Sequence, residues 1–123
     1  MIGLGGTGGF MLENLLRMGA ERFEIFEDDR IELSNFNRQM LSNDDNLDQL
    51  KSAAAKAHAR SINDDAVLRF CGRYDGRTNL HRSDIVLDGS DDIATKALAA
   101  SASYTAKIPY VFCSAQDSRG IVS

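Results

Sequence analysis

The sequence predicts an α/β fold in which a mainly parallel, doubly wound sheet carries helices on both faces. Two observations lead to this prediction. Segments with helical spacing of apolar residues alternate with short β-branched and aromatic runs along the chain, and such alternation is typical of parallel sheets covered by crossover helices. A glycine run, Gly3-Leu4-Gly5-Gly6-Thr7-Gly8, also stands directly before the first predicted helix, as in Rossmann-like nucleotide-binding folds.

The glycine run predicts a sharp turn that leads into a helix at residues 8–18. Met11, Leu12 and Leu15 recur there at helical spacing, and Gly19 is a typical residue for ending a helix. Only two residues precede the run, whereas this type of turn follows a whole buried strand. We therefore expect a fragment of a longer protein whose first strand is missing.

The other predicted elements follow in strict alternation. Alanine-rich or periodic segments predict helices at about 47–61 and at 93–106. Short apolar runs predict strands at 23–26, 66–71, 85–87 and 110–113, with a further strand beginning at Ile121. No repeat or linker interrupts the pattern, so residues 1–123 are expected to form a single domain.

Composition narrows the possible partners. The 123 residues are 43% hydrophobic and 26% charged, and their formal net charge is −4. A chain that binds nucleic acid nonspecifically relies on clustered Lys and Arg, which are absent here, so no nucleic-acid partner is expected. Since no apolar run is long enough to cross a membrane, we expect no membrane partner and a cytoplasmic location.

The cysteines and histidines do not form a recognisable metal site. Cys71 and Cys113 lie far apart in the sequence without a C-x-x-C pair, so we expect buried, reduced thiols. His58 and His81 lack ligand spacing to each other, and structural or surface roles are expected for both.

Three segments are predicted to meet at the carboxyl ends of the strands, where ligands bind in such sheets. They are the glycine run, the acidic segment Glu27-Asp28-Asp29 and the segment 88–92. Glu27 lies about 20 residues past the turn, where an acid commonly hydrogen-bonds a ribose. Asp91 has two interpretations: it either caps the following helix, which spacing alone favours, or holds Mg²⁺ beside phosphates.

Beyond these segments, the sequence resembles the ThiF/MoeB/HesA adenylyltransferases, which are relatives of the ubiquitin-activating enzymes. The resemblance extends over residues 3–122 and rests on four segments in the same order. These are the glycine run, the acidic segment continuing into Leu33-Ser34-Asn35-Phe36-Asn37-Arg38-Gln39, Lys51, and Asp84-Ile85-Val86-Leu87-Asp88-Gly89-Ser90-Asp91. The Ser-Asn-x-x-Arg-Gln part is the specific one, because a dehydrogenase has no use for it.

The resemblance implies ATP-dependent activation of a carboxylate by acyl-adenylate formation. The implied partner is a ubiquitin-like or sulfur-carrier protein with a C-terminal Gly-Gly, or a peptide, and the implied assembly is a homodimer. The implied catalytic residues are Arg38, Lys51 and Asp91, with Asp91 also the Mg²⁺ ligand. The implied nucleotide-binding residues are Gly3, Gly5, Gly6, Gly8, Glu27, Asp29, Asn35, Arg38, Lys51 and Asp88.

Two other functions remain open. A nicotinamide-dependent oxidoreductase would also use the glycine run and Glu27. A non-catalytic scaffold resembling the activating enzymes is the second alternative, because Glu27, Asp92 and Lys96 stand where the family usually has Asp, Asn and Arg.

Overall fold

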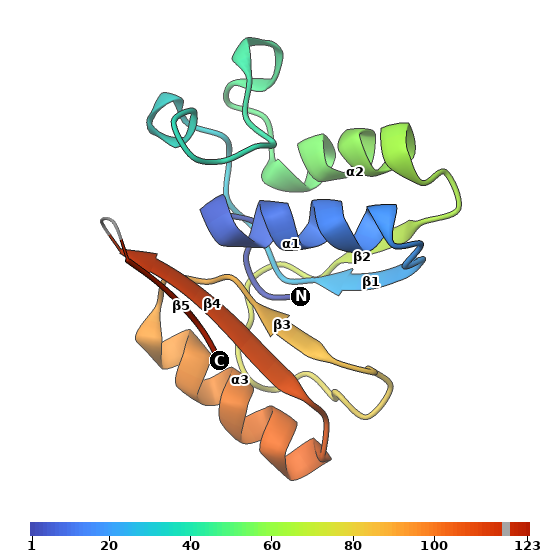
Figure 1. Cartoon of the computed structure of the whole chain (residues 1–123), viewed down its shortest axis with the longest axis vertical. Coiled ribbons are helices and arrows are strands. Elements are labelled where there is room, and N and C mark those ends of the chain that lie inside the picture. Colours follow the sequence, from blue (N-terminus) through green and yellow to red (C-terminus); the bar gives the residue numbers. More distant parts are fainter. Residues whose placement is uncertain (117–118) are drawn as a thin grey trace.

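The computed structural model describes residues 1–116 and 119–123. Helices and strands alternate along the first half of the chain, with two short 3-10 turns after the first strand (Figure 1). The strict alternation predicted from the sequence is not kept, because the strands at 67–70 and 86–88, and those at 110–116 and 119–122, follow each other with no helix between them. In order, the elements are α1 (Gly6–Arg17), β1 (Arg22–Ile25), η1 (Leu33–Asn35), η2 (Asp44–Asn46), α2 (Lys51–Ile62), β2 (Val67–Phe70), β3 (Val86–Asp88), α3 (Ile93–Ala106), β4 (Tyr110–Gln116) and β5 (Arg119–Val122).

The N-terminal dipeptide joins two strand pairs into one sheet. β1 pairs in parallel with β2, and β3 pairs in parallel with β4. Ile2 lies between the pairs, with parallel bridges to Phe26 and Asp88, and its N–H donates to the carbonyl of Leu87 at 2.9 Å. The order across the sheet is therefore β2, β1, Ile2, β3, β4, β5, which is the arrangement of a doubly wound fold.

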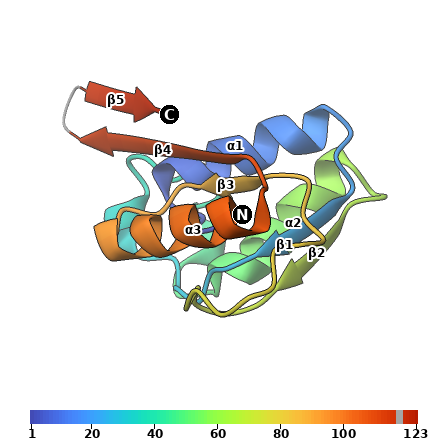
Figure 2. The same ribbon diagram turned by 90° about the horizontal axis from the view of Figure 1, so that it is seen from below.

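Separate apolar cores lie on the two faces of this sheet. α1 and α2 cover one face, where Leu12 and Leu16 pack with Ile25 and Ala55. α3 covers the opposite face, where Ala99 packs with a cluster that includes Phe26 (Figures 1 and 2). Helices on both faces confirm the predicted fold class.

β4 and β5 form a hairpin that departs from the parallel pattern. The two strands pair antiparallel, from Cys113 opposite Val122 to Gln116 opposite Arg119. β5 forms the outer edge of the sheet, and all four of its residues are exposed (Figure 2). The sequence predicted a strand here from Ile121 onward, and the structure confirms it.

The predicted bounds of two helices shift for identifiable reasons. α1 begins at Gly6 rather than at residue 8, because the glycine run itself supplies the first turn, with the N–H of Gly9 donating to the carbonyl of Gly5 at 3.0 Å. α2 begins at Lys51 rather than near 47, because the preceding residues are tied back to the chain at Ile31: the N–H of Ile31 donates to Gln49 at 2.8 Å.

Both cysteines are free thiols, as predicted, but neither is fully buried. Cys71 directly follows β2, the edge strand at the other side of the sheet, and its Sγ–H donates to the carboxylate of Glu24 at 3.3 Å. Cys113 lies on β4 and lines a cavity of about 1240 Å³. The expectation of burial was wrong because edge and cavity positions leave a side chain covered on one side only.

His58 has the structural role expected of it. Its Nε2 contacts the carboxylate of Glu13 and so links α2 to α1. The hydrogen bond from His58 is the main cause that lowers the pKa of Glu13.

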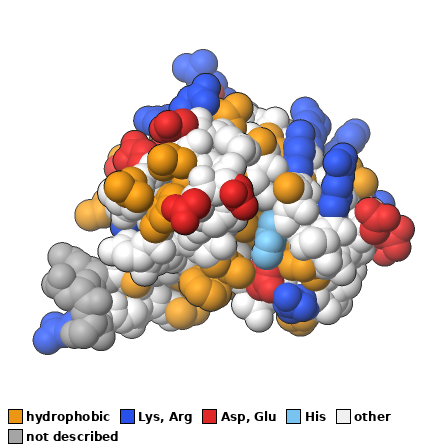
Figure 3. All heavy atoms as spheres, turned by 90° about the horizontal axis from the view of Figure 1, so that it is seen from above, with side chains coloured by type: hydrophobic (Ala, Val, Ile, Leu, Met, Phe, Trp, Pro, Cys, Tyr) orange, Lys and Arg blue, Asp and Glu red, His pale blue; other side chains and the backbone are white. Residues whose placement is uncertain are grey.

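Acidic, basic and apolar side chains are interspersed on the face seen from above in Figure 3. Within residues 1–116 and 119–123, no helix has the length and apolar character needed to cross a membrane.

We predict that Gly8→Ala destabilises the fold strongly. A Cβ at this position would lie 2.1 Å from the carbonyl oxygen of Gly3, inside the closest turn of the chain. The expected loss in the free energy of unfolding is about 3 kcal/mol, the upper end of overpacking costs, measured by urea denaturation. Gly5→Ala is the matched control, because its Cβ would meet only the end of Gln39 at 4.0 Å. Equal unfolding midpoints for the two variants would contradict the close approach.

Candidate functional site

A cavity of about 1240 Å³ opens where the parallel strands end at their carboxyl edge. Four parts of the chain that the sequence had singled out contribute to its lining. These are Gly3, Gly5, Gly6 and Thr7 of the glycine run, Glu27, Asp28 and Asp29 after β1, Asn35, Arg38, Gln39 and Lys51 around the 3-10 turns and α2, and Gly89, Ser90, Asp91 and Asp92 after β3.

The glycine run forms the floor of the cavity and directs the N-terminus of α1 into it. Gly3 has φ +78°, which favours glycine, and a Cβ there would lie 3.1 Å from the N of Ser90. Gly5 is the N-cap residue of α1 and makes no side-chain cap, so the first N–H groups of the helix remain available to an anion. Gly8 differs from the other predicted glycines: it is buried and does not line the cavity. Glycine is required at position 8 because the backbone packs closely on Gly3.

Glu27 connects the glycine run to the end of β1. Its Oε2 accepts the N–H of Leu4 at 2.8 Å, and its Oε1 accepts the N–H of Asp29 at 2.9 Å. The side chain is 6% exposed. One edge of this carboxylate thus faces the cavity, while backbone donors fix its orientation.

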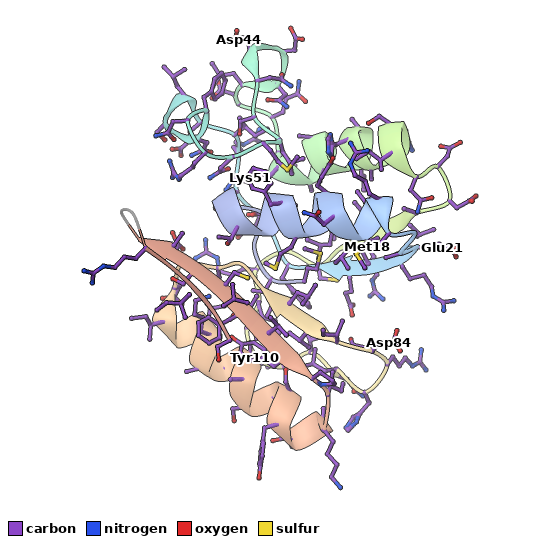
Figure 4. All side chains as sticks on the ribbon, in the orientation of Figure 1. Met18, Glu21, Asp44, Lys51, Asp84 and Tyr110 are labelled. Atoms are coloured by element: carbon purple, nitrogen blue, oxygen red, sulfur yellow. The ribbon has the colours of Figure 1, made fainter. Side chains whose placement is uncertain are left out.

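Lys51 is the buried cation of the site. It is the first residue of α2 and lies beside the N-terminal end of α1 (Figure 4). Its ammonium group lies 3.1 Å from Oδ2 of Asp29 and 3.8 Å from Oε2 of Glu27. The side chain is 7% exposed, so the paired carboxylates offset much of the cost of burying its charge.

Arg38 lines the same cavity. Its Nη1 donates to the carbonyl of Ser34 at 2.8 Å and to Oδ1 of Asn37 at 3.0 Å. A Cβ on Gly6 would lie 3.6 Å from Cγ of Arg38, so the arginine stem rests on the glycine run. The structure therefore brings Arg38 and Lys51, from separate segments, to one cavity with the N-terminus of α1.

Asn35 stabilises the 3-10 turn that precedes Arg38. It is buried, it lines the cavity, and its Oδ1 accepts the N–H of Glu32 at 3.1 Å. The contact closes η1, the turn that presents Arg38.

Asp88 was predicted to bind nucleotide, but its carboxylate does not reach the cavity. The residue is fully buried, and Tyr110 donates its hydroxyl to Oδ2 at 2.8 Å. Burial, followed by this hydrogen bond, raises the pKa of Tyr110. Asp88 therefore acts inside the fold and contacts the ligand space only through the residues that follow it.

Asp91 and Asp92, the two aspartates before α3, differ in their contacts. Asp92 is the N-cap of α3 and accepts from the N–H and the hydroxyl of Thr95, both at 2.7 Å. The Thr95 hydroxyl is the main cause that lowers the pKa of Asp92. The interpretation of Asp91 as the helix cap is wrong by one residue, and Asp91 lines the cavity instead.

Sequence reasoning missed two cations that line the cavity, Arg30 and Arg73. Arg73 lines the cavity from the loop after β2, and its Nε lies 3.4 Å from Oδ2 of Asp28. No motif marks this loop in the sequence. The carboxylate oxygens of Glu27, Asp28 and Asp29 lie within 4.8 Å of one another, and the contacts of Arg73 and Lys51 balance part of that charge.

Comparison with known proteins agrees with the sequence resemblance. A family model described as "ThiF family" matches residues 1–123. The SAMP-activating enzyme E1 of Haloferax volcanii is 30% identical over 102 residues, which cover 80% of this chain and 38% of that protein. The sulfur carrier protein ThiS adenylyltransferase of Escherichia coli is 30% identical over 119 residues, covering 94% and 47%. The chain thus spans less than half the length of these relatives.

Two solved structures show the same fold. The E. coli tRNA N6-threonylcarbamoyladenosine dehydratase in complex with AMP aligns with a TM-score of 0.84 at 24% identity, over 90% of this chain and 47% of that one. E. coli MccB with MccA-N7isoASN aligns with a TM-score of 0.85 at 22% identity, over 99% and 37%. At these identities the likeness establishes the fold alone.

We predict that Asp92→Ala destabilises the protein and that Asp91→Ala does not. Only Asp92 satisfies free N–H groups at the start of α3. The lowered pKa means that the ionised form stabilises the fold, so the deficit of Asp92→Ala is full at neutral pH. It shrinks as the pH falls below the ordinary carboxyl value of 3.8. Urea midpoints measured across pH test this, and a deficit shared equally by both variants would contradict it.

Proposed function

The chain belongs to the ThiF family, and we propose that it performs ATP-dependent adenylylation of a carboxylate on a ubiquitin-like protein, a sulfur-carrier protein or a peptide. The observation that carries the proposal is the meeting of Arg38 and Lys51 at the cavity whose floor is the glycine run. A pair of cations beside a helix N-terminus suits a polyphosphate. Homodimerisation and a cytoplasmic location belong to the same proposal.

The donor groups of the cavity fit a nucleoside triphosphate. Backbone N–H groups at the start of α1 and the guanidinium of Arg38 suit phosphate oxygens, and Glu27 offers carboxylate oxygens to ribose hydroxyls. The cavity volume of about 1240 Å³ is ample for ATP. Two structures of one fold relative support this choice of ligand, since the dehydratase was solved with AMP and with ATP.

Asp91 is the residue that fits Mg²⁺ in this proposal. It lines the cavity near the glycine run, and among the described residues its carboxylate makes no hydrogen bond or ion pair. A free carboxylate beside phosphate oxygens is the usual protein contribution to a magnesium site. When bound, the ion would neutralise charge on the phosphates.

The residues of the cavity would act by positioning and by charge neutralisation. In the proposed step, a carboxylate oxygen of the substrate attacks the α-phosphorus, and the bond to the bridging oxygen of the β-phosphate breaks. An acyl-adenylate forms and pyrophosphate leaves. Arg38 can hold two phosphate oxygens at once, while Lys51 acts as a point charge. The helix N-terminus fixes the remaining phosphate oxygens.

The proposed substrate class follows from the relatives. The matched curated proteins include sulfur carrier protein adenylyltransferases and a SAMP-activating enzyme E1, and one fold relative was solved with the peptide MccA-N7isoASN. These names support a protein or peptide as the substrate, and the carboxylate is what the family resemblance implies.

We predict that Arg38→Ala lowers ATP–pyrophosphate exchange by about 100-fold or more, the usual effect of removing one preorganised charge contact. Exchange would be measured with each ubiquitin-like protein of the same organism that ends in Gly-Gly. Arg60→Ala is the control, because Arg60 is exposed on α2 and lies outside the cavity lining. Wild-type exchange rates in the Arg38 variant would contradict its assignment.

Ligand binding separates the alternatives. We predict that calorimetric titration detects ATP with Mg²⁺ and gives no heat of binding with NADH, because two cations at the glycine run suit three consecutive phosphates. Tight NADH binding would favour an oxidoreductase instead. ATP binding without exchange, for every partner tested, would favour the non-catalytic scaffold.

A further inference from the structure

Asp88 gathers four donors around a carboxylate that has no exposed surface. Its Oδ1 accepts the N–H of Ser90 at 2.8 Å and the hydroxyl of Ser90 at 2.6 Å. The ammonium of Lys96, a residue of α3, lies 3.5 Å from the same oxygen. Oδ2 accepts the hydroxyl of Tyr110, which stands at the start of β4 (Figure 4). One buried group thus connects β3, α3 and β4.

The turn at residues 89–90, which Asp88 holds by hydrogen bonds, is in close backbone contact with the glycine run. A Cβ on Gly89 would lie 2.7 Å from the N of Gly8, and one on Gly3 would lie 3.1 Å from the N of Ser90. The hydroxyl of Thr7 also donates to the carbonyl of Gly89 at 3.2 Å. The backbones of the two loops therefore touch, and the position of one limits the position of the other.

We propose that Asp88 is the positioning residue that fixes the turn 89–90, and through it Asp91, against the phosphate-binding end of α1. The inference rests on the proposed function, since it concerns how that site is aligned. Asp88 itself does not line the cavity, so its effect is transmitted by the turn.

The arrangement needs a carboxylate rather than a side chain of similar shape. Two oxygens with four lone-pair sites accept both donors of Ser90, the Tyr110 hydroxyl and the charge of Lys96. An amide has one acceptor oxygen, so Asp88→Asn would direct an NH₂ group toward a donor on one side. It would also leave Lys96, 16% exposed, without its counter-charge.

The effect should be greatest on metal binding. The glycine run keeps a second anchor, the bond from Leu4 to Glu27, when Asp88 is changed. The turn 89–90 loses the hydrogen bonds that order it just before Asp91. Loss of a supporting contact behind a metal ligand typically weakens metal binding 10- to 100-fold.

The test is electron paramagnetic resonance titration of Mn²⁺ in the presence of a nonhydrolysable ATP analogue. In Asp88→Asn we expect Mn²⁺ affinity about 10-fold lower, while the affinity for the metal-free analogue changes by less than about threefold because the glycine run keeps its other anchor. Tyr110→Phe removes the donor to Oδ2 of Asp88, together with the weaker contact of the same hydroxyl to the carbonyl of Lys96, and leaves both Ser90 donors in place. It should give a smaller change in the same direction. This second variant keeps the test valid if Asp88→Asn fails to fold.

Val86→Ala is the matched control for lost stability. Val86 is buried in β3, two residues before Asp88. Its side chain is apolar and therefore makes no hydrogen bond to the turn. It should lower the thermal midpoint and leave Mn²⁺ affinity unchanged. Unchanged Mn²⁺ affinity in both Asp88→Asn and Tyr110→Phe would overturn the inference alone. Wild-type protein that binds no ATP analogue would overturn the proposed function and the inference together.

Discussion

The buried carboxylate of Glu27 is the interaction on which the site depends. It accepts the N–H of Leu4 from the glycine run and the N–H of Asp29 beyond β1, and it lies near the ammonium of Lys51 on α2. The three segments are separate in the sequence, and Glu27 contacts all of them. Because removal of one partner from a buried ionic cluster leaves an uncompensated charge, the three positions are interdependent. A single acidic side chain therefore sets the geometry of the cavity floor and of one wall.

Sheet topology places this carboxylate opposite a second one. Ile2 lies between β1 and β3, so Glu27, which follows β1, and Asp88, the last residue of β3, flank the same glycine run. Glu27 holds the run from one side by a hydrogen bond, and the turn after Asp88 limits it from the other by backbone contact. Glycine is required at Gly8 and Gly89 because a Cβ would overlap the neighbouring backbone, and at Gly3 because φ is +78° and the backbone of Ser90 lies close. The glycine run is thus confined from both sides.

The sequence predicts the fold well and the site only in part. Periodicity identifies α3 at its observed bounds, Ile93–Ala106, because an alanine-rich helix with a clear start leaves few alternatives. The cap of that helix was placed one residue early: Asp91 and Asp92 are equivalent in type, and only the Thr95 hydroxyl three residues after Asp92 distinguishes them. Burial of Asp88 could not be predicted, since Tyr110 reaches it from β4, the strand that pairs with β3. Such contacts depend on packing between elements, which local patterns do not contain.

The charge balance of the cavity explains why a divalent cation suits the proposed chemistry. Among the described residues, the lining holds four basic side chains, Arg30, Arg38, Lys51 and Arg73, and six acidic ones, Glu27, Asp28, Asp29, Glu32, Asp91 and Asp92. Several of the cations are already paired: Lys51 with Asp29, and Arg73 with Asp28. A bare triphosphate would therefore enter a site of net negative charge, where like charges repel at short range. In the proposed function, a divalent cation that arrived with the nucleotide would convert the free carboxylate of Asp91 from a source of repulsion into a ligand. The acidic lining, unfavourable for a polyanion alone, would then favour the metal-bound form.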